Sequence, residues 1–175
     1  MRIISGRYRG MVLAEFKGRD IRPTADRVKE SLFNILSGDI AGARVLDLFC
    51  GSGNLGIECL SRGAAFVQFN DISKDSVAVL RKNLARVEGE YSVTNLDFRL
   101  SLSSGEGYDI IFIDPPYAAE YGREALEIIS KRNKLSADGV AVYERDRAFS
   151  SEVAGLELYD ERKYGKTYLS FFKKS

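Results

Sequence analysis

From Arg44 to Glu144 the chain alternates between short apolar runs and longer amphipathic segments. The apolar runs predict β-strands over residues 44–48, 66–70, 91–96, 108–113 and 139–144. Between them, apolar side chains recur at helical spacing over residues 55–62, 74–87 and 120–130, with a shorter helical or irregular piece after residue 96. Strands that are apolar on both faces and alternate with helices predict an α/β fold, in which a mostly parallel sheet has helices on both faces.

The two ends of the chain follow other patterns. Residues 2–16 predict a β-hairpin, and Thr24 can cap a helix that runs to about residue 36. The apolar stripe of this helix consists of Val28, Leu32, Ile35 and Leu36. Residues 157–162 and 167–173 predict a last hairpin, which would add an antiparallel edge to the sheet. We therefore expect one domain over residues 1–175, with an N-terminal extension at residues 1–40 and a core at residues 41–175.

The first strand of the core leads into a glycine-rich turn that opens a helix, Cys50-Gly51-Ser52-Gly53-Asn54-Leu55-Gly56. Such a turn can hold an extended polar ligand, because backbone amides at a helix N-terminus face it. Its G-x-G-x-x-G spacing also suits a dinucleotide, so a nicotinamide enzyme is one candidate. Asp47 ends the strand, where an amino-acid ammonium would offset the cost of burying its carboxylate. The alternative is a polar strand end that the loop leaves in solvent.

Four carboxylates fall at or just after predicted strand ends: Asp47, Asp71, Asp97 and Asp114. Ligands of parallel sheets bind beyond the carboxyl ends of the strands, so we expect these side chains to converge there. Asp71 lies 18 positions after Gly53, near the spacing at which an acid holds ribose hydroxyls, although it could cap the next helix instead. Asp97 could accept a hydrogen bond from the adenine amine or serve an ordinary turn.

The sharpest motif is Asp114-Pro115-Pro116-Tyr117, directly after an apolar strand. Two prolines offer carbonyl oxygens without amide hydrogens, which makes a rigid, acceptor-rich edge beside the carboxylate. Its natural complement is an exocyclic amine on a nucleobase, with Tyr117 as the flat surface for the ring. Accepting both amine hydrogens at Asp114 and the Pro115 carbonyl would localise the nitrogen lone pair and aim it at an electrophile. The alternative is a Pro-Pro turn that only ends the strand.

Charge and composition narrow the function further. The net charge is +1, but residues 1–30 carry eight basic and four acidic side chains, which indicates a local contact with a polyanion. The chain has no histidine, which excludes a Ser-His-Asp triad and a histidine-ligated zinc site, and its two cysteines lack metal-type spacing. We therefore expect no metal. Without an apolar leader or a long apolar run, we expect a cytoplasmic protein with reduced thiols.

Together, the glycine turn and the Asp-Pro-Pro-Tyr motif resemble the class I S-adenosylmethionine-dependent methyltransferases, which have a Rossmann-like fold. Further segments, over nearly the whole chain, are similar to the RsmD family of 16S ribosomal RNA guanine-N2 methyltransferases. They are Arg2-Ile-Ile-Ser-Gly, Arg22-Pro-Thr-Ala-Asp-Arg-Val-Lys-Glu-Ser-Leu-Phe-Asn, Asp47-Leu-Phe-Cys-Gly-Ser-Gly-Asn-Leu-Gly and Tyr164-Gly-Lys-Thr. The resemblance implies 16S rRNA as the partner, within an assembled or assembling small subunit, with guanine 966 as the family's usual target.

The resemblance also implies roles for individual residues. The cofactor would be bound by Asp47, Phe49, Gly51, Ser52, Gly53, Asp71, Ile72, Asp97 and Phe98. Within this set, Asp47 and the glycine turn would hold the methionine end, Asp71 the ribose, and Asp97 with Phe98 the adenine. The target guanine would lie against Asp114, Pro115, Pro116 and Tyr117, and RNA would contact Arg2, Arg7, Arg9, Arg22 and Arg27. Family members usually have Glu at the position of Asp71 and an acid at that of Ser73, so a cofactor role for Ser73 is not implied.

Three other functions fit part of the sequence. A DNA adenine-N6 methyltransferase also uses Asp-Pro-Pro-Tyr, but it normally has a separate recognition region for which 175 residues leave no room. A nicotinamide oxidoreductase fits the glycine spacing and leaves Asp47 and the residues 114–117 unexplained. A non-catalytic RNA-binding module fits the basic arm, but it has no need for strand-end carboxylates that repel phosphate.

Overall fold

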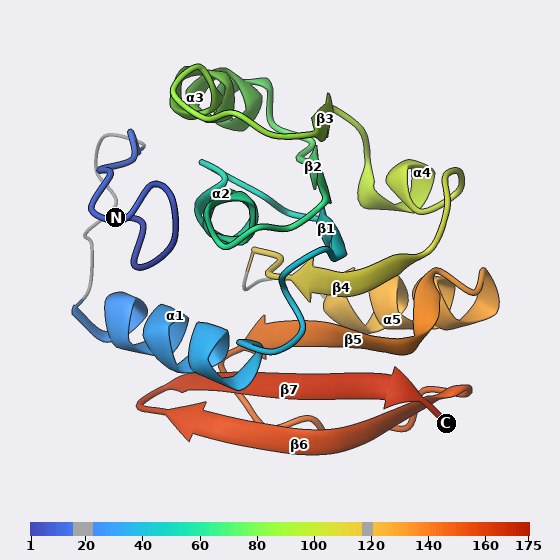
Figure 1. Ribbon diagram of the computed structural model, residues 1–175. Coiled ribbons are helices and arrows are strands. Elements are labelled where there is room, and N and C mark those ends of the chain that lie inside the picture. Colours follow the sequence, from blue (N-terminus) through green and yellow to red (C-terminus); the bar gives the residue numbers. More distant parts are fainter. Residues whose placement is uncertain (16–22, 117–120) are drawn as a thin grey trace.

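The computed structural model describes residues 1–15, 23–116 and 121–175, with the backbone alone at residues 23–25. These residues form one seven-stranded sheet in the order β3-β2-β1-β4-β5-β7-β6 (Figure 1). The strands are β1 (Arg44–Asp47), β2 (Phe66–Asn70), β3 (Tyr91–Thr94), β4 (Tyr108–Ile113), β5 (Leu135–Arg145), β6 (Leu156–Tyr164) and β7 (Thr167–Lys174). Strands β1 to β5 are parallel, and β7 pairs antiparallel with both β5 and β6. The mostly parallel sheet and its antiparallel C-terminal edge are confirmed.

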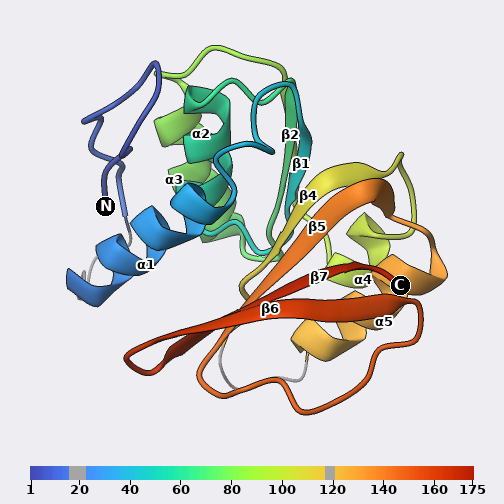
Figure 2. The ribbon, with the colours of Figure 1, turned by 60° about the horizontal axis from the view of Figure 1, so that its bottom comes forward.

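Helices cover both faces of the sheet, as predicted (Figures 1 and 2). Their bounds are α1 (Pro23–Ile35), α2 (Asn54–Ser61), α3 (Lys74–Leu84), α4 (Phe98–Ser101) and α5 (Tyr121–Lys131). Helices α1, α2 and α3 lie on one face, and α4 and α5 on the other. Adjacent residues of β1 show why both faces are apolar, because Val45 belongs to the buried cluster on the first face and Leu46 to that on the second.

Helix α1 confirms three of the four residues in its predicted stripe. Val28, Leu32 and Leu36 are buried, whereas Ile35 is 37% exposed, so its inclusion was wrong. The buried face is centred instead on Leu32 and the fully buried Phe33, which leaves Ile35 at the rim.

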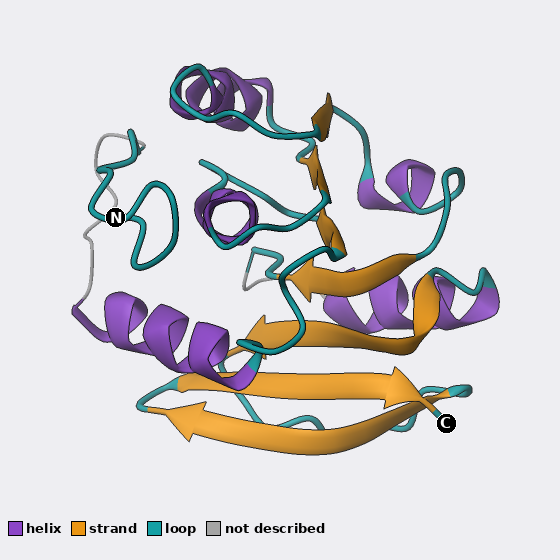
Figure 3. Ribbon diagram, in the orientation of Figure 1, coloured by secondary structure: helices purple, strands orange, loops and turns teal. Residues whose placement is uncertain are grey.

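The N-terminal segment folds back on itself as predicted, but its two arms pair over a single isolated bridge and form no extended strands (Figure 3). Within residues 1–15, Arg2 and Val12 form an isolated antiparallel bridge, and the Ile3 and Leu13 amides donate to the carbonyls of Met11 and Met1 at 2.9 and 3.0 Å. The predicted range ends at Phe16, outside the described residues. Contacts with helix α2 explain why the pairing extends no further. The Ile4 amide donates to the Glu58 carboxylate at 2.8 Å, so backbone groups that a partner strand would bind are engaged by a side chain instead.

The C-terminal hairpin is confirmed, with β7 inserted between β5 and β6. Among the described residues, none of the helices has both the length and the apolar composition that a bilayer crossing requires.

Candidate active site

The turn between β1 and α2 contains two glycines that differ in how closely other atoms approach them. Gly51 has φ 54°, and a side chain built on it would meet nothing within 4 Å. Gly53 has φ 86°, and its Cβ would lie 2.3 Å from the Leu80 Cδ1. Both conformations favour glycine. The backbone therefore borders open space at Gly51, while Gly53 allows the turn to pack closely against α3.

Two of the predicted carboxylates fasten this turn. Asp47 accepts a hydrogen bond from the Gly56 amide, and Asp71 accepts one from the Gly51 amide, both at 2.9 Å. Asp47 is only 2% exposed, so it is not a solvated strand end. Burial raises its pKa to about 7, the Gly56 hydrogen bond partly offsets this, and the charges of Asp114 and Asp71 raise it further. A cationic ligand group would relieve this cost.

Asn70, which the sequence reasoning missed, holds three strand ends together. Its side-chain nitrogen donates to the carbonyls of Leu48 at 3.2 Å and Leu96 at 3.1 Å. Its side-chain oxygen accepts from the Thr94 hydroxyl at 2.7 Å. Asn70 is 1% exposed and joins the ends of β1, β2 and β3. A polar residue at the end of an apolar run was the available signal.

An exposed apolar edge follows β2 and β3. Ile72 is 68% exposed and Leu96 is 38% exposed. The Asn95 side chain donates to the carbonyls of Asp71 and Ile72 at 2.8 and 2.9 Å, which holds this turn in place. Ile72, one of the residues expected to bind the cofactor, therefore stands as an open apolar surface directly after Asp71.

Asp97 and Phe98 are engaged differently from Asp47 and Asp71. Asp97 caps α4 by accepting from the Arg99 amide at 2.9 Å, and its carboxylate pairs with the Arg99 guanidinium at 3.0 Å. Phe98 is 4% exposed, and its ring centroid lies 5.3 Å from that of Phe49. Asp97 thus carries its own counter-charge, and Phe98 packs in the core beside Phe49.

Asp114 lies where β4 ends, between the ends of β1 and β5. Its charge raises the pKa of Asp47 on one side and that of Glu144 on the other. For Glu144 the larger cause is burial, and the pKa reaches about 8. Pro115 is buried and Pro116 is exposed, whereas Tyr117 lies outside the described residues. Glu144 was missed, although it too is an acid at the end of an apolar strand.

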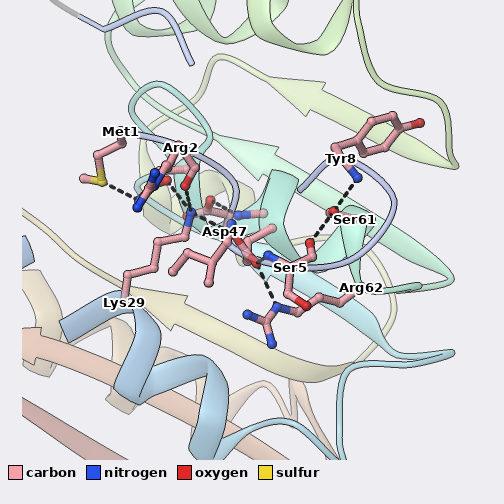
Figure 4. Close-up of polar contacts among 12 residues, drawn as sticks. Met1, Arg2, Ser5, Tyr8, Lys29, Asp47, Ser61 and Arg62 are labelled. Carbon is pink, nitrogen blue, oxygen red and sulfur yellow. Dashed lines mark hydrogen bonds and ion pairs between the residues drawn. The ribbon is translucent and has the colours of Figure 1, made fainter. Parts of the chain in front are cut away.

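A buried ionic network joins the N-terminal segment to α2 (Figure 4). The Lys29 ammonium contacts the Glu58 carboxylate at 2.9 Å, the Asn54 side-chain oxygen at 2.7 Å and the Arg2 carbonyl at 3.0 Å. Arg62 donates to the same carboxylate at 2.8 Å. Because Asn54 is the first residue of α2, this network ties the basic segment to the glycine turn.

The arginines expected to contact RNA differ in their exposure and in their ion pairing. Arg2, Arg9 and Arg27 are exposed, and Arg7 is exposed but paired with Glu88. Arg22 lies outside the described residues. The arrowheads of β4 and β5 point toward the side on which the N-terminal segment and the start of α1 lie (Figures 1 and 2). The described basic side chains are thus carried on the segments beyond the strand ends.

The sheet order, the glycine turn fastened by strand-end carboxylates and the Asp-Pro-Pro sequence after β4 define a class I methyltransferase. The chain belongs to the family described as "Conserved hypothetical protein 95", the RsmD family, whose profile matches residues 1–173.

Relatives in two bacteria are named "Ribosomal RNA small subunit methyltransferase D". The Escherichia coli K12 protein is 33% identical, over 99% of this chain and 90% of the relative. The Haemophilus influenzae protein is 34% identical, over 84% of this chain and 79% of the relative. The solved structure described as "Putative methyltransferase yhhF from Escherichia coli" has a TM-score of 0.90 at 32% identity, over 100% of this chain and 98% of that one.

Proposed function

We propose that this chain transfers a methyl group from S-adenosylmethionine to the exocyclic N2 of a guanine in 16S ribosomal RNA, within an assembled or assembling small subunit. The observation that carries the proposal is the position of Asp114 and Pro115 beside the Asp47 end of β1. Asp114 and the Pro115 carbonyl, which can accept the two hydrogens of an amine, then lie next to the Asp47 carboxylate, which can bind the ammonium group of an amino acid. The names of the two bacterial relatives support ribosomal RNA as the substrate.

The residues around the glycine turn fit S-adenosylmethionine. Open space at Gly51 admits the methionine end against the backbone, and the buried Asp47 carboxylate would bind its ammonium. Asp71 already accepts from the Gly51 amide, and the lone pairs that remain on its oxygens can take ribose hydroxyls. The exposed Ile72 would pack on the adenosine. When bound, the cofactor supplies a methyl group on a positively charged sulfur.

The residues after β4 prepare the nucleophile. Asp114 and the Pro115 carbonyl accept the two hydrogens of the guanine amine, which localises the nitrogen lone pair and directs it at the methyl carbon. The new N–C bond forms as the C–S bond breaks, with the bonding electrons going to sulfur. The nitrogen then loses one proton, which the Asp114 carboxylate would accept. No histidine is needed.

A folded RNA surface would have to supply much of the binding. The exposed Arg2, Arg9 and Arg27 offer few phosphate contacts, and such contacts weaken at physiological salt. The target base must also leave its stack to reach Asp114, which is least costly in a loop. These points favour an assembled particle over naked RNA.

The test is transfer of labelled methyl from S-adenosylmethionine to small subunits, protein-free 16S RNA and duplex DNA, followed by digestion to nucleosides. We expect N2-methylguanosine, most strongly from the particles. N6-methyladenine from the DNA would instead support the DNA adenine methyltransferase, and binding of NAD in place of S-adenosylmethionine would support the oxidoreductase.

A further inference from the structure

Arg145 is held in place by aromatic rings. It is the last residue of β5, and alternation along the strand from Tyr143, a member of the cluster on the α5 face, places its side chain on that face. Its guanidinium lies over the rings of Tyr143 and Phe149, at 5.2 and 5.3 Å from their centroids. In the described part of the chain, its buried Nε has no hydrogen-bond partner, and its guanidinium is in no ion pair. The rings therefore fix a positive charge that is left for an anionic ligand.

A pocket of about 180 Å³ lies against Arg145. Pro115 and Pro116 line one part of it, and Arg123 from α5 and Arg147 from the segment after β5 line another. The two prolines have no amide hydrogen, so they offer an anion no backbone donor. The donors on this side must come from the three guanidinium groups, each of which can bind phosphate oxygens in a bidentate manner. The pocket therefore suits an anion with several oxygens.

The acids paired with two of these arginines hold them only weakly. Arg123 contacts Glu127 at 3.0 Å, and Arg147 contacts Asp146 at 3.7 Å. All four side chains are at least half exposed. Exposed pairs of this kind contribute little free energy, so their guanidinium groups can turn to a phosphate at low cost.

Two further acids near β5 are directed elsewhere. Glu144 borders the pocket, but alternation along β5 assigns its side chain to the α1 face. Glu161 accepts from the Phe149 amide at 3.0 Å and from the Ser170 hydroxyl at 2.6 Å. The Glu161 bonds also anchor the segment after β5 to the C-terminal hairpin, so the pocket wall keeps a defined position.

The C-terminal hairpin extends the positive surface. Arg145 pairs with Tyr168, and Tyr168 pairs with Lys163, so the three side chains share the α5 face. Lys163 is exposed, and its ammonium lies 5.3 Å from the centroid of the Tyr168 ring. The hairpin tip at Tyr164–Thr167 lies at the carboxyl end of β5 (Figure 1). The Tyr164-Gly-Lys-Thr segment of the sequence thus belongs to the same edge of the sheet as Asp114.

Basic side chains therefore lie beside the strand ends on the α5 side as well. They are Arg123, Arg145, Arg147 and Lys163. We propose that these four cations bind backbone phosphates of the RNA next to the target nucleotide. The target base must leave its stack to reach Asp114, so the backbone that carries it passes the strand ends.

This placement sets the path of the RNA. The N-terminal segment, with its exposed arginines, packs on the α1 face, where Ile3 and Leu13 join the buried cluster. The RNA strand would therefore cross the edge of the sheet, with cations on both sides of the unstacked base. This inference rests on the proposed function, and it names a second part of the RNA-binding surface.

The experiment measures the affinity of small-subunit particles over a range of salt concentrations. Arg145→Gln removes the charge and should weaken binding roughly 10-fold or more. The slope of log affinity against log salt should fall by about 0.7–0.9, the share of one phosphate contact. Arg145→Lys keeps the charge and should keep most of the slope. The matched control is Arg132→Gln, an exposed arginine at the opposite end of α5 from Arg123, which should change neither quantity.

Calorimetry with S-adenosylmethionine shows for each variant whether the fold is kept. Arg145→Gln that binds the cofactor normally and keeps the wild-type affinity and salt slope for particles overturns the inference, while the proposed function stands. If Arg145→Gln does not fold, the exposed Arg147→Gln takes its place, with the same expected loss of slope and the same contrary outcome. Absence of N2-methylguanosine from particles treated with the wild-type chain overturns the proposed function, and this inference with it.

Discussion

The Lys29 ammonium and the Glu58 carboxylate lie 2.9 Å apart, with side-chain exposures of 3% and 0%. This pair links α1 to α2, and Glu58 also receives the amides of Ile4 and Ser5. Burial alone would raise the pKa of Glu58, but the Lys29 charge, the Ile4 amide and the other donors outweigh it and lower that pKa. The carboxylate is therefore the charged centre about which the N-terminal segment is held.

Replacing Glu58 by glutamine should destabilise the protein, because Lys29 would keep a buried charge without its counter-ion. We expect the free energy of unfolding to fall by about 3–5 kcal/mol. The control is Glu88→Gln, which removes the exposed partner of Arg7 and should cost about 0.5 kcal/mol or less. Urea denaturation of both variants measures the difference, and equal midpoints would contradict it.

Gly51→Ala should separate ligand binding from folding. The left-handed backbone at Gly51 makes alanine cost about 1–2 kcal/mol, but its Cβ meets no protein atom. It would project into the space assigned to the cofactor, so the dissociation constant for S-adenosylmethionine should rise roughly 5- to 150-fold, as expected of overpacking by 1–3 kcal/mol. Gly38→Ala, also in open space and without positive φ, should leave binding unchanged. Calorimetry that finds unchanged affinity for Gly51→Ala would refute the assignment.

Asp47→Asn should stabilise the protein at alkaline pH. The native pKa of about 7 exceeds the ordinary value of 3.8, so the native state binds more protons and stability falls as pH rises between these values. At about pH 8 the variant should be more stable by about 2–4 kcal/mol, and at about pH 4 by almost nothing. Its cofactor affinity should fall in exchange. The exposed Asp39→Asn is the control, and a pH-independent difference in urea midpoints would show that burial of charge is not the cause.

Asp71 and Asp97 should differ in their effect on cofactor affinity. Asp71→Ala removes the acceptor for the Gly51 amide and the proposed ribose contact, and should weaken S-adenosylmethionine binding by about 1.5–3 kcal/mol. Asp97 is already paired with Arg99, so Asp97→Ala should weaken binding far less. Parallel calorimetric titrations test this, and a larger loss for Asp97→Ala would place the adenosine at α4 instead.

The core elements could be predicted because their signals are local. The apolar run that forms β4 matches its predicted bounds, residue for residue. The short extent of the N-terminal hairpin could not be predicted, because several of its amides bond to Glu58 and Ser61, more than fifty positions away. No periodicity within the first fifteen residues reveals a partner on another helix.

Residues of the candidate site could be predicted where the position of a residue at the end of its own strand was sufficient to identify it. Asp47 ends one apolar strand and Asp71 follows another, and they accept hydrogen bonds from the amides of Gly56 and Gly51. Asn70 and Glu144 gave the same signal, but their importance depends on which strands are neighbours. Only the pairing of β4 with β5 places Glu144 beside Asp114. Likewise, the counter-charge on Asp97 comes from Arg99, a residue that the sequence gives no reason to direct toward it.

The insertion of β7 between β5 and β6 sets an order of assembly during synthesis. Strand β6 leaves the ribosome before β7, yet among the strands that the structure describes β7 is its one neighbour in the sheet. Until Thr167–Lys174 is made, β5 therefore keeps an open backbone edge, and β6 has no strand beside it. Open edges are the surfaces through which chains pair with one another and aggregate. The nascent protein is thus most prone to mispairing after β6 has been synthesised and before β7 is available. Insertion of β7 between β5 and β6 then covers the open edge.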